Sequence, residues 1–200
     1  MLFRSDARAL HIDFIDEALD HRKWAFAADV VRFYAVYTEG GVYMDSDILL
    51  YRGFDHLVPQ HGFATFNESI AGEGSAFCLQ AAFFMGEKGN DFCRQMVNYY
   101  RDRHFVKADG SLDETISPVI MARLAEGYGI TNTATTQRLG AITVYPTHYV
   151  APRKRYAKTA ETFARHLVNH SWKKRKLGRK VEIFIKHQYH VLKFKLTKRY

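Results

Sequence analysis

Apolar side chains recur at helical spacing in two stretches near the start of the chain. Residues 11–22 predict a short amphipathic helix, whose apolar positions are Ile12, Ile15, Ala18 and Leu19. Residues 23–38 carry two apolar stripes, which predicts a helix covered on most of its sides. These stripes consist of Trp24, Ala27, Val31 and Tyr34, and of Phe26, Val30, Phe33 and Tyr37. Because glycine tolerates the backbone angles of a helix exit, we expect Gly40 and Gly41 to end the second helix.

Short apolar runs and helix-length segments alternate farther along the chain. The runs predict strands over residues 42–44, 48–51, 62–66, 81–85 and 141–145. Helices are predicted over residues 90–103 and 113–126. This alternation favours an α/β fold with a mixed or mostly parallel sheet flanked by helices.

Composition places the chain among globular proteins. Of its 200 residues, 47% are hydrophobic and 25% are charged, which excludes wholesale disorder and collagen-like chains. Cys78 and Cys93 are the only cysteines, so a disulfide-stapled miniprotein is excluded. This cysteine content fits a reducing compartment or a protein indifferent to redox conditions. No apolar run approaches the roughly 18 residues that a membrane span needs. The first six residues do not resemble a secretory signal. We therefore expect a cytoplasmic protein.

The positive charge is concentrated at the C-terminal end. The formal net charge is +8, but residues 173–200 contain eleven Lys and Arg residues against one acidic residue, Glu182. The other 172 residues hold 18 basic and 20 acidic residues. The sequence pI of about 9.4 is therefore a property of this tail. The total charge is thus no argument for nucleic-acid binding.

The basic tail also carries apolar residues at helical spacing, namely Leu177, Val181, Phe184, Ile185, Leu192 and Leu196. A basic amphipathic helix can lie on an anionic membrane surface, which predicts peripheral contact with the inner face of the cell membrane. A helix packed on the body of the protein is an equal alternative, and residues 181–185 also alternate like a strand. Nucleic-acid binding is a third reading, not expected because no recognised module is present. We expect two domains, residues 1–172 and 173–200.

An aspartate pair carries the main chemical signal. Asp45 and Asp47 leave a predicted strand, and Mg²⁺ and Mn²⁺ prefer oxygen ligands of this kind. Taken alone, such a tripeptide is more often a solvated acidic turn. In the preceding helix, Asp29 and Arg32 share a face, as an ion pair or as partners for sugar hydroxyls and phosphate. Tyr43 either stacks on a base or ribose or packs as an ordinary strand residue.

These residues resemble the sugar-binding DXD region of glycosyltransferase family 32. The family is related to yeast α-1,6-mannosyltransferases and to bacterial capsular and surface polysaccharide enzymes. The resemblance runs from Ala27 to Phe33 and from Tyr37 to Asp47. The chain departs from the family pattern at two positions, where Ala28 replaces a serine and Val36 replaces a leucine.

A second segment, Thr162 to Trp172, resembles the closing segment of the same family. This resemblance implies that His166, Ser171 and Trp172 lie at the metal and the diphosphate. Without the first motif, His166 would be interpreted as a satisfied strand histidine. The departures from the family pattern are Leu167 and His170.

The resemblance implies a GT-A-type nucleotide-diphospho-sugar transferase fold and a retaining, metal-dependent hexosyltransferase of polysaccharide or capsule biosynthesis. The implied partners are a nucleotide-sugar donor and a glycan or lipid-linked acceptor, and the implied cofactor is Mn²⁺ or Mg²⁺. The implied catalytic residues are Asp45, Asp47, Asp29 and Arg32. The implied donor-binding residues are Asp29, Arg32, Gly41, Tyr43, Asp45, Ser171 and Trp172. The implied metal ligands are Asp45, Asp47 and His166.

Two alternatives to an active transferase remain at this point. Family members usually carry a further strand and helix in front of this region. The chain is therefore expected to be N-terminally shortened, and it could be an inactive sugar-nucleotide-binding remnant. A Mg²⁺-dependent DxD phosphatase is less compatible, because its motif needs a longer apolar strand and a Thr or Val where this chain has Leu49.

Overall fold

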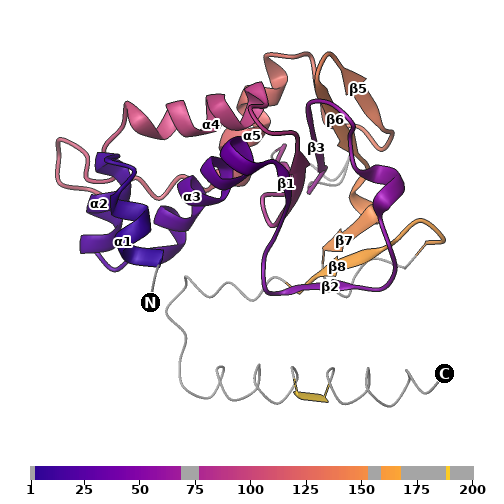
Figure 1. Ribbon diagram of the computed structural model, residues 1–200, viewed down its shortest axis with the longest axis horizontal. Coiled ribbons are helices and arrows are strands. Elements are labelled where there is room, and N and C mark those ends of the chain that lie inside the picture. Colours follow the sequence, from indigo (N-terminus) through magenta and orange to yellow (C-terminus); the bar gives the residue numbers. More distant parts are fainter. Residues whose placement is uncertain (1–2, 69–76, 153–158, 168–187, 190–200) are drawn as a thin grey trace. The chain divides into compact units, whose positions relative to one another are not determined.

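A computed structural model describes residues 3–68, 77–152, 159–167 and 188–189 (Figure 1). The chain divides into two compact units, Met1–Val168 and Asn169–Tyr200. In the second unit only residues 188–189 are described, and they are helical. Apart from these two residues, the predicted basic tail lies outside the described residues, as do Ser171 and Trp172. Within the described ranges, no helix combines the length and the apolar character that crossing a membrane requires.

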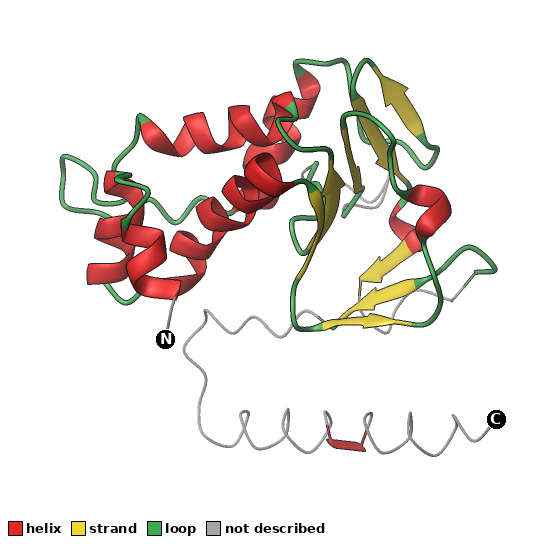
Figure 2. Cartoon of the chain, viewed as in Figure 1, coloured by secondary structure: helices red, strands yellow, loops and turns green. Residues whose placement is uncertain are grey.

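Five α-helices occur in the described part of the chain (Figure 2). They are α1 (Phe3–Arg8), α2 (Asp13–Asp20), α3 (Trp24–Glu39), α4 (Asp91–Arg101) and α5 (Ser117–Glu126). The predictions of α2, α3 and α4 are confirmed to within a few residues, and α1 was not predicted. Helix α5 begins four residues later than predicted, at Ser117, since Pro118 suits the first turn of a helix and disfavours helical structure before it.

The strands form two sheets. In order, the larger sheet holds β1 (Gly41–Met44), β4 (Phe83–Gly86), β3 (Phe63–Phe66), β6 (Ile142–Tyr145) and β5 (Gln137–Leu139). The smaller sheet holds β2 (Ile48–Leu50), β8 (Ala164–His166) and β7 (Val150–Pro152). Short 3₁₀ helices occupy Asp55–Leu57 and Thr147–Tyr149.

The predicted α/β class with a mixed sheet flanked by helices is confirmed, but a mostly parallel sheet is wrong. In the larger sheet only β3 and β6 run parallel, whereas the other three described pairs are antiparallel. A parallel pair needs a long crossover, and only the connection from β3 to β6 contains helices, α4 and α5. Strands β5, β7 and β8 were not predicted, because their sequences, Gln-Arg-Leu, Val-Ala-Pro and Ala-Arg-His, are not apolar runs of the kind that predicted β2.

Strand β4 separates two apolar clusters. Phe84 belongs to the cluster that includes side chains of all five helices, and its ring stacks on Phe33 of α3 with centroids 4.7 Å apart. Phe83 points to the other face, as alternation along a strand requires, and packs 5.4 Å from Phe163 beside β8. The larger sheet therefore lies between the helices and the smaller sheet (Figure 1).

A close backbone approach at the start of β3 and β6 depends on glycine. Gly62 has a φ of +82°, and a Cβ there would collide with the backbone of Ala141. We expect Gly62→Ala to lower the free energy of unfolding by more than the roughly 1–3 kcal/mol of backbone strain alone. Gly110→Ala is the matched control, because its φ is +78° and no described atom lies within 4 Å of the added Cβ. Equal losses in urea unfolding would contradict the collision.

Candidate metal and donor site

The turn that holds Asp45 and Asp47 carries the chain from the larger sheet to the smaller one. β1 ends at Met44 in one sheet and β2 begins at Ile48 in the other (Figure 1). The N–H of Asp45 donates to the carbonyl of Ala82 (2.8 Å), and the N–H of Ile48 donates to the carbonyl of Asp45 (3.1 Å). These backbone bonds fix the turn at the junction of the two sheets.

The smaller sheet brings a histidine to this junction. In β8, His166 lies opposite Ile48 of β2, and the N–H of Leu167 donates to the carbonyl of Asp47 (3.0 Å). Asp45, Asp47 and His166 each offer one ligand atom, and these atoms lie within 4.8 Å of one another. Nε2 of His166 is 3.5 Å from Oδ1 of Asp47. Two carboxylates and an imidazole, all half-buried, suit a divalent cation.

Neighbouring side chains hold the carboxylate of Asp45. The hydroxyl of Tyr43 donates to Asp45 Oδ1 at 2.6 Å, and Nη1 of Arg32 lies 3.6 Å from the same oxygen. Both contacts use Oδ1, so a cation could take Oδ2 without breaking either. Burial raises the pKa of the Tyr43 phenol, which keeps the hydroxyl protonated and able to donate.

Asp29 and Arg32 form a buried ion pair in contact with this turn. Nη2 of Arg32 lies 2.9 Å from Asp29 Oδ1, and the side chains are only 10% (Arg32) and 13% (Asp29) exposed. Nη1 of Arg32 also donates to the carbonyl of Ala81 at 2.9 Å. The hydroxyl and the N–H of Ser117 hydrogen-bond to the Asp29 carboxylate. The pair therefore links α3, the approach to β4 and the start of α5.

The pair is electrostatically coupled. Burial raises the pKa of the Asp29 carboxyl, while Arg32 and Ser117 act in the opposite direction. Burial by itself lowers the pKa of the Arg32 guanidinium, but Asp29, Tyr43 and Asp45 outweigh it, and the pKa is raised. Arg32 therefore stays charged and serves two carboxylates at once.

The structure brings together most of the residues that the sequence singled out. Gly41 is an exposed residue of β1 with φ of +100°. Ser171 and Trp172 lie outside the described residues. Two contacts were not predicted from the sequence, that of Ser117 with Asp29 and that of Glu68 with His166. The position of Glu68, an acidic residue soon after a fully buried strand, was the available signal for the second.

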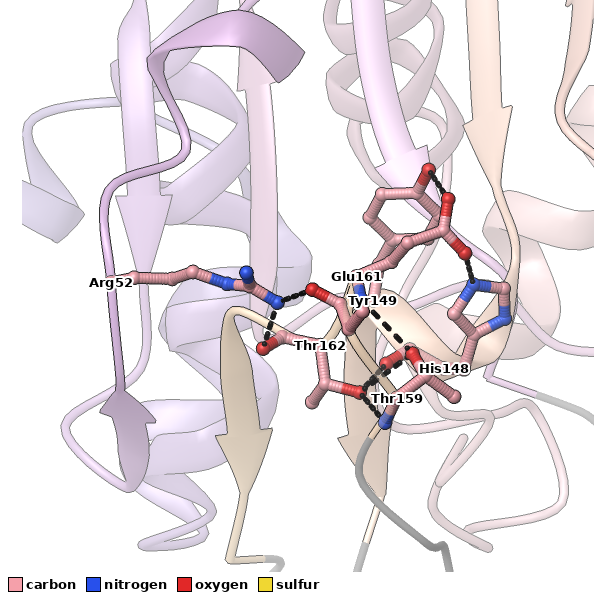
Figure 3. A network of polar contacts seen from close by, with 7 residues as sticks. Arg52, His148, Tyr149, Thr159, Glu161 and Thr162 are labelled. Atoms are coloured by element: carbon pink, nitrogen blue, oxygen red, sulfur yellow. Dashed lines mark hydrogen bonds and ion pairs between the residues drawn. The ribbon is translucent and has the colours of Figure 1, made fainter.

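A network of polar contacts joins the segment that precedes β8 to residues near β2 and β7 (Figure 3). Arg52, which follows β2, donates to the carbonyls of Ala160 and Thr162. Glu161 accepts from the hydroxyl of Tyr149 (2.9 Å) and lies 2.8 Å from Nε2 of His148. These contacts tie the segment before β8 to its surroundings, and so they support the position of His166.

Comparison with known proteins agrees with this geometry. Residues 4–64 match a family model described as the glycosyltransferase sugar-binding region containing the DXD motif. No curated protein matches the chain. The match covers α3, β1 and the turn with Asp45 and Asp47, and the α/β fold with its mixed sheet is consistent with a GT-A-like fold. Residues 4–64 are thus similar to the sugar-binding region of DXD-containing glycosyltransferases.

Proposed function

We propose that the chain is a metal-dependent glycosyltransferase that moves a sugar from a nucleotide-diphosphate sugar to a glycan or lipid-linked acceptor. The observation that carries the proposal is the convergence of Asp45, Asp47 and His166 within 4.8 Å, inside a fold whose first third matches a DXD sugar-binding region. We further propose retention of configuration at the transferred sugar and a role in cell-surface polysaccharide biosynthesis. These two points rest on the resemblance to glycosyltransferase family 32.

The donor set gives each residue a defined task. Asp45, Asp47 and His166 would hold Mn²⁺ or Mg²⁺, and the imidazole nitrogen favours Mn²⁺. A divalent cation bound there supplies positive charge against the negative charge that builds on the departing diphosphate. Tyr43 and Arg32 keep the Asp45 carboxylate in one orientation through Oδ1, so the site is organised before the donor arrives.

Other residues extend the proposed donor site. Contact of Asp29, Arg32 and Gly41 with the donor remains a proposal. The side chains of Asp29 and Arg32 are little exposed, so we propose that the donor contacts only the parts of them that face the turn of Asp45 and Asp47. Ser171 and Trp172 are proposed to close over the diphosphate and exclude water.

The proposed setting of the enzyme is the cytoplasmic side of the cell membrane. Residues 1–172 would form the catalytic domain, and residues 173–200 would form a basic amphipathic tail in contact with anionic lipid. This setting fits a lipid-linked acceptor, and it follows from the charge and periodicity of the tail.

Donor binding tests the proposal. We expect the full chain to bind a UDP- or GDP-sugar with Mn²⁺ present, and we expect Asp47→Ala to abolish this binding in isothermal titration calorimetry. Asp102→Ala removes an exposed aspartate at the end of α4 and should bind the donor like the parent chain. Slow donor hydrolysis that follows the same pattern would support transfer chemistry.

Other outcomes would favour the alternatives. A chain that binds donor but neither hydrolyses nor transfers it would be a sugar-nucleotide-binding remnant. Hydrolysis of small phosphomonoesters without donor binding would indicate a phosphatase. The absence of binding for every donor would contradict the transferase proposal.

A further inference from the structure

We propose that Glu68 is a positioning residue for His166, whose Nδ1 proton it accepts so that Nε2 faces the cation site. The inference rests on the proposed function, because it concerns the cation site of Asp45, Asp47 and His166. It adds a residue outside the matched region 4–64.

The two residues lie at the ends of strands that belong to different sheets. Glu68 lies two residues beyond β3, and its N–H donates to the carbonyl of Cys78 at 2.9 Å. His166 is the last residue of β8. Oε1 of Glu68 lies 3.8 Å from Nδ1 of His166, and the side chains are 24% and 12% exposed, respectively. Glu68 thus faces one ring nitrogen, while Asp47 faces the other.

The chemistry of a neutral imidazole makes this arrangement consequential. A ring that coordinates a cation through Nε2 must carry its proton on Nδ1. In His166, Nδ1 is buried, and no hydrogen-bond partner lies within reach of it in the described part of the chain. A buried donor left without a partner is destabilising, because it has lost its hydrogen bonds to water. A shift of about 1 Å would bring the Glu68 carboxylate into a charge-assisted hydrogen bond with Nδ1.

The geometry separates this role from direct coordination. The cluster whose ligand atoms converge within 4.8 Å consists of Asp45, Asp47 and His166, without Glu68. Carboxylates that accept the second N–H of a ligating histidine fix the ring and raise its basicity, and their loss typically lowers metal affinity 10–100-fold. Glu68 would act on the cation through His166.

Mn²⁺ affinity of the full chain, measured by electron paramagnetic resonance of free Mn²⁺, tests this role. We expect Glu68→Ala to weaken binding about 10–100-fold. Glu68→Gln keeps an oxygen acceptor and should recover most of the affinity. In a His166→Ala background, we expect Glu68→Ala to change the remaining affinity by less than about twofold, because the coupling has been removed. The thermal unfolding midpoint without Mn²⁺ verifies that each variant folds.

Three results would overturn the inference. Unchanged Mn²⁺ affinity in Glu68→Ala would show that His166 needs no support from Glu68, and would leave the proposed function intact. An equal loss with and without His166 would show that Glu68 acts directly on the cation. A parent chain that binds no Mn²⁺ would overturn this inference together with the proposed cation site.

Discussion

Replacing Arg32 with methionine is expected to lower the free energy of unfolding by about 3–5 kcal/mol, because it leaves the buried Asp29 carboxylate without its counter-charge. Methionine keeps much of the volume of the arginine stem, so the loss measures charge more than packing. The substitution also removes the hydrogen bond to the Ala81 carbonyl and the contact with Asp45. Urea unfolding at pH 7 measures the effect.

The loss in Arg32→Met should depend on pH. Burial raises the pKa of Asp29, and removing Arg32 takes away the largest opposing influence, so the folded-state pKa rises further. The folded variant then binds a proton that the unfolded chain has released, and its stability falls as pH rises from the ordinary aspartate pKa through the raised value. The destabilisation relative to the parent chain should therefore be smaller near pH 4.5 than at pH 7.

A double variant provides the control for this ion pair. Asp29→Asn in the Arg32→Met background removes the buried charge and keeps a side chain that Ser117 can hydrogen-bond. We expect it to recover a large part of the lost stability at pH 7 and to lose the added pH dependence. If the double variant were less stable than Arg32→Met, an uncompensated charge could not be the cause of the loss.

The fold was predictable where a periodic pattern of apolar residues extends over many positions. The two stripes of residues 23–38 predicted α3 to within one residue at each end. Sheet membership was not predictable, because Val42–Met44 and Ile48–Tyr51 look alike in sequence and yet join different sheets. That outcome depends on partners far along the chain, namely β4 for β1 and β8 for β2.

The candidate site likewise has residues that the local sequence indicates and contacts that only the tertiary structure shows. Asp45 and Asp47 could be recognised from local sequence, and the resemblance of the closing segment pointed to His166. The support around them could not be recognised. Ser117 reaches Asp29 from 88 positions away, and Glu68 meets His166 across two sheets. Contacts of this kind depend on tertiary packing and leave no pattern at a fixed spacing.

Removing divalent cations is expected to lower donor turnover by about 10³-fold. Neutralisation of a departing phosphate is worth several kcal/mol, and each 1.36 kcal/mol corresponds to a tenfold change in rate. Release of nucleoside diphosphate from the donor, followed before and after treatment with EDTA, measures the effect. Added Mn²⁺ should restore the rate, and the Asp45→Asn variant should not be restored at the same concentration.

His166 provides the sharper test of the same site. If His166 is a ligand, His166→Ala should raise the Mn²⁺ concentration that gives half of the maximal rate, because one of three converging donor atoms is lost. His61→Ala is the matched control, since the His61 side chain is 87% exposed and pairs with Glu87. A Mn²⁺ titration of His166→Ala that superimposes on the parent chain would remove His166 from the ligand set and leave Asp45 and Asp47 in it. Turnover insensitive to EDTA would contradict the role of the cation itself. The diphosphate would then depart at the same rate without the positive charge that the cation is proposed to supply.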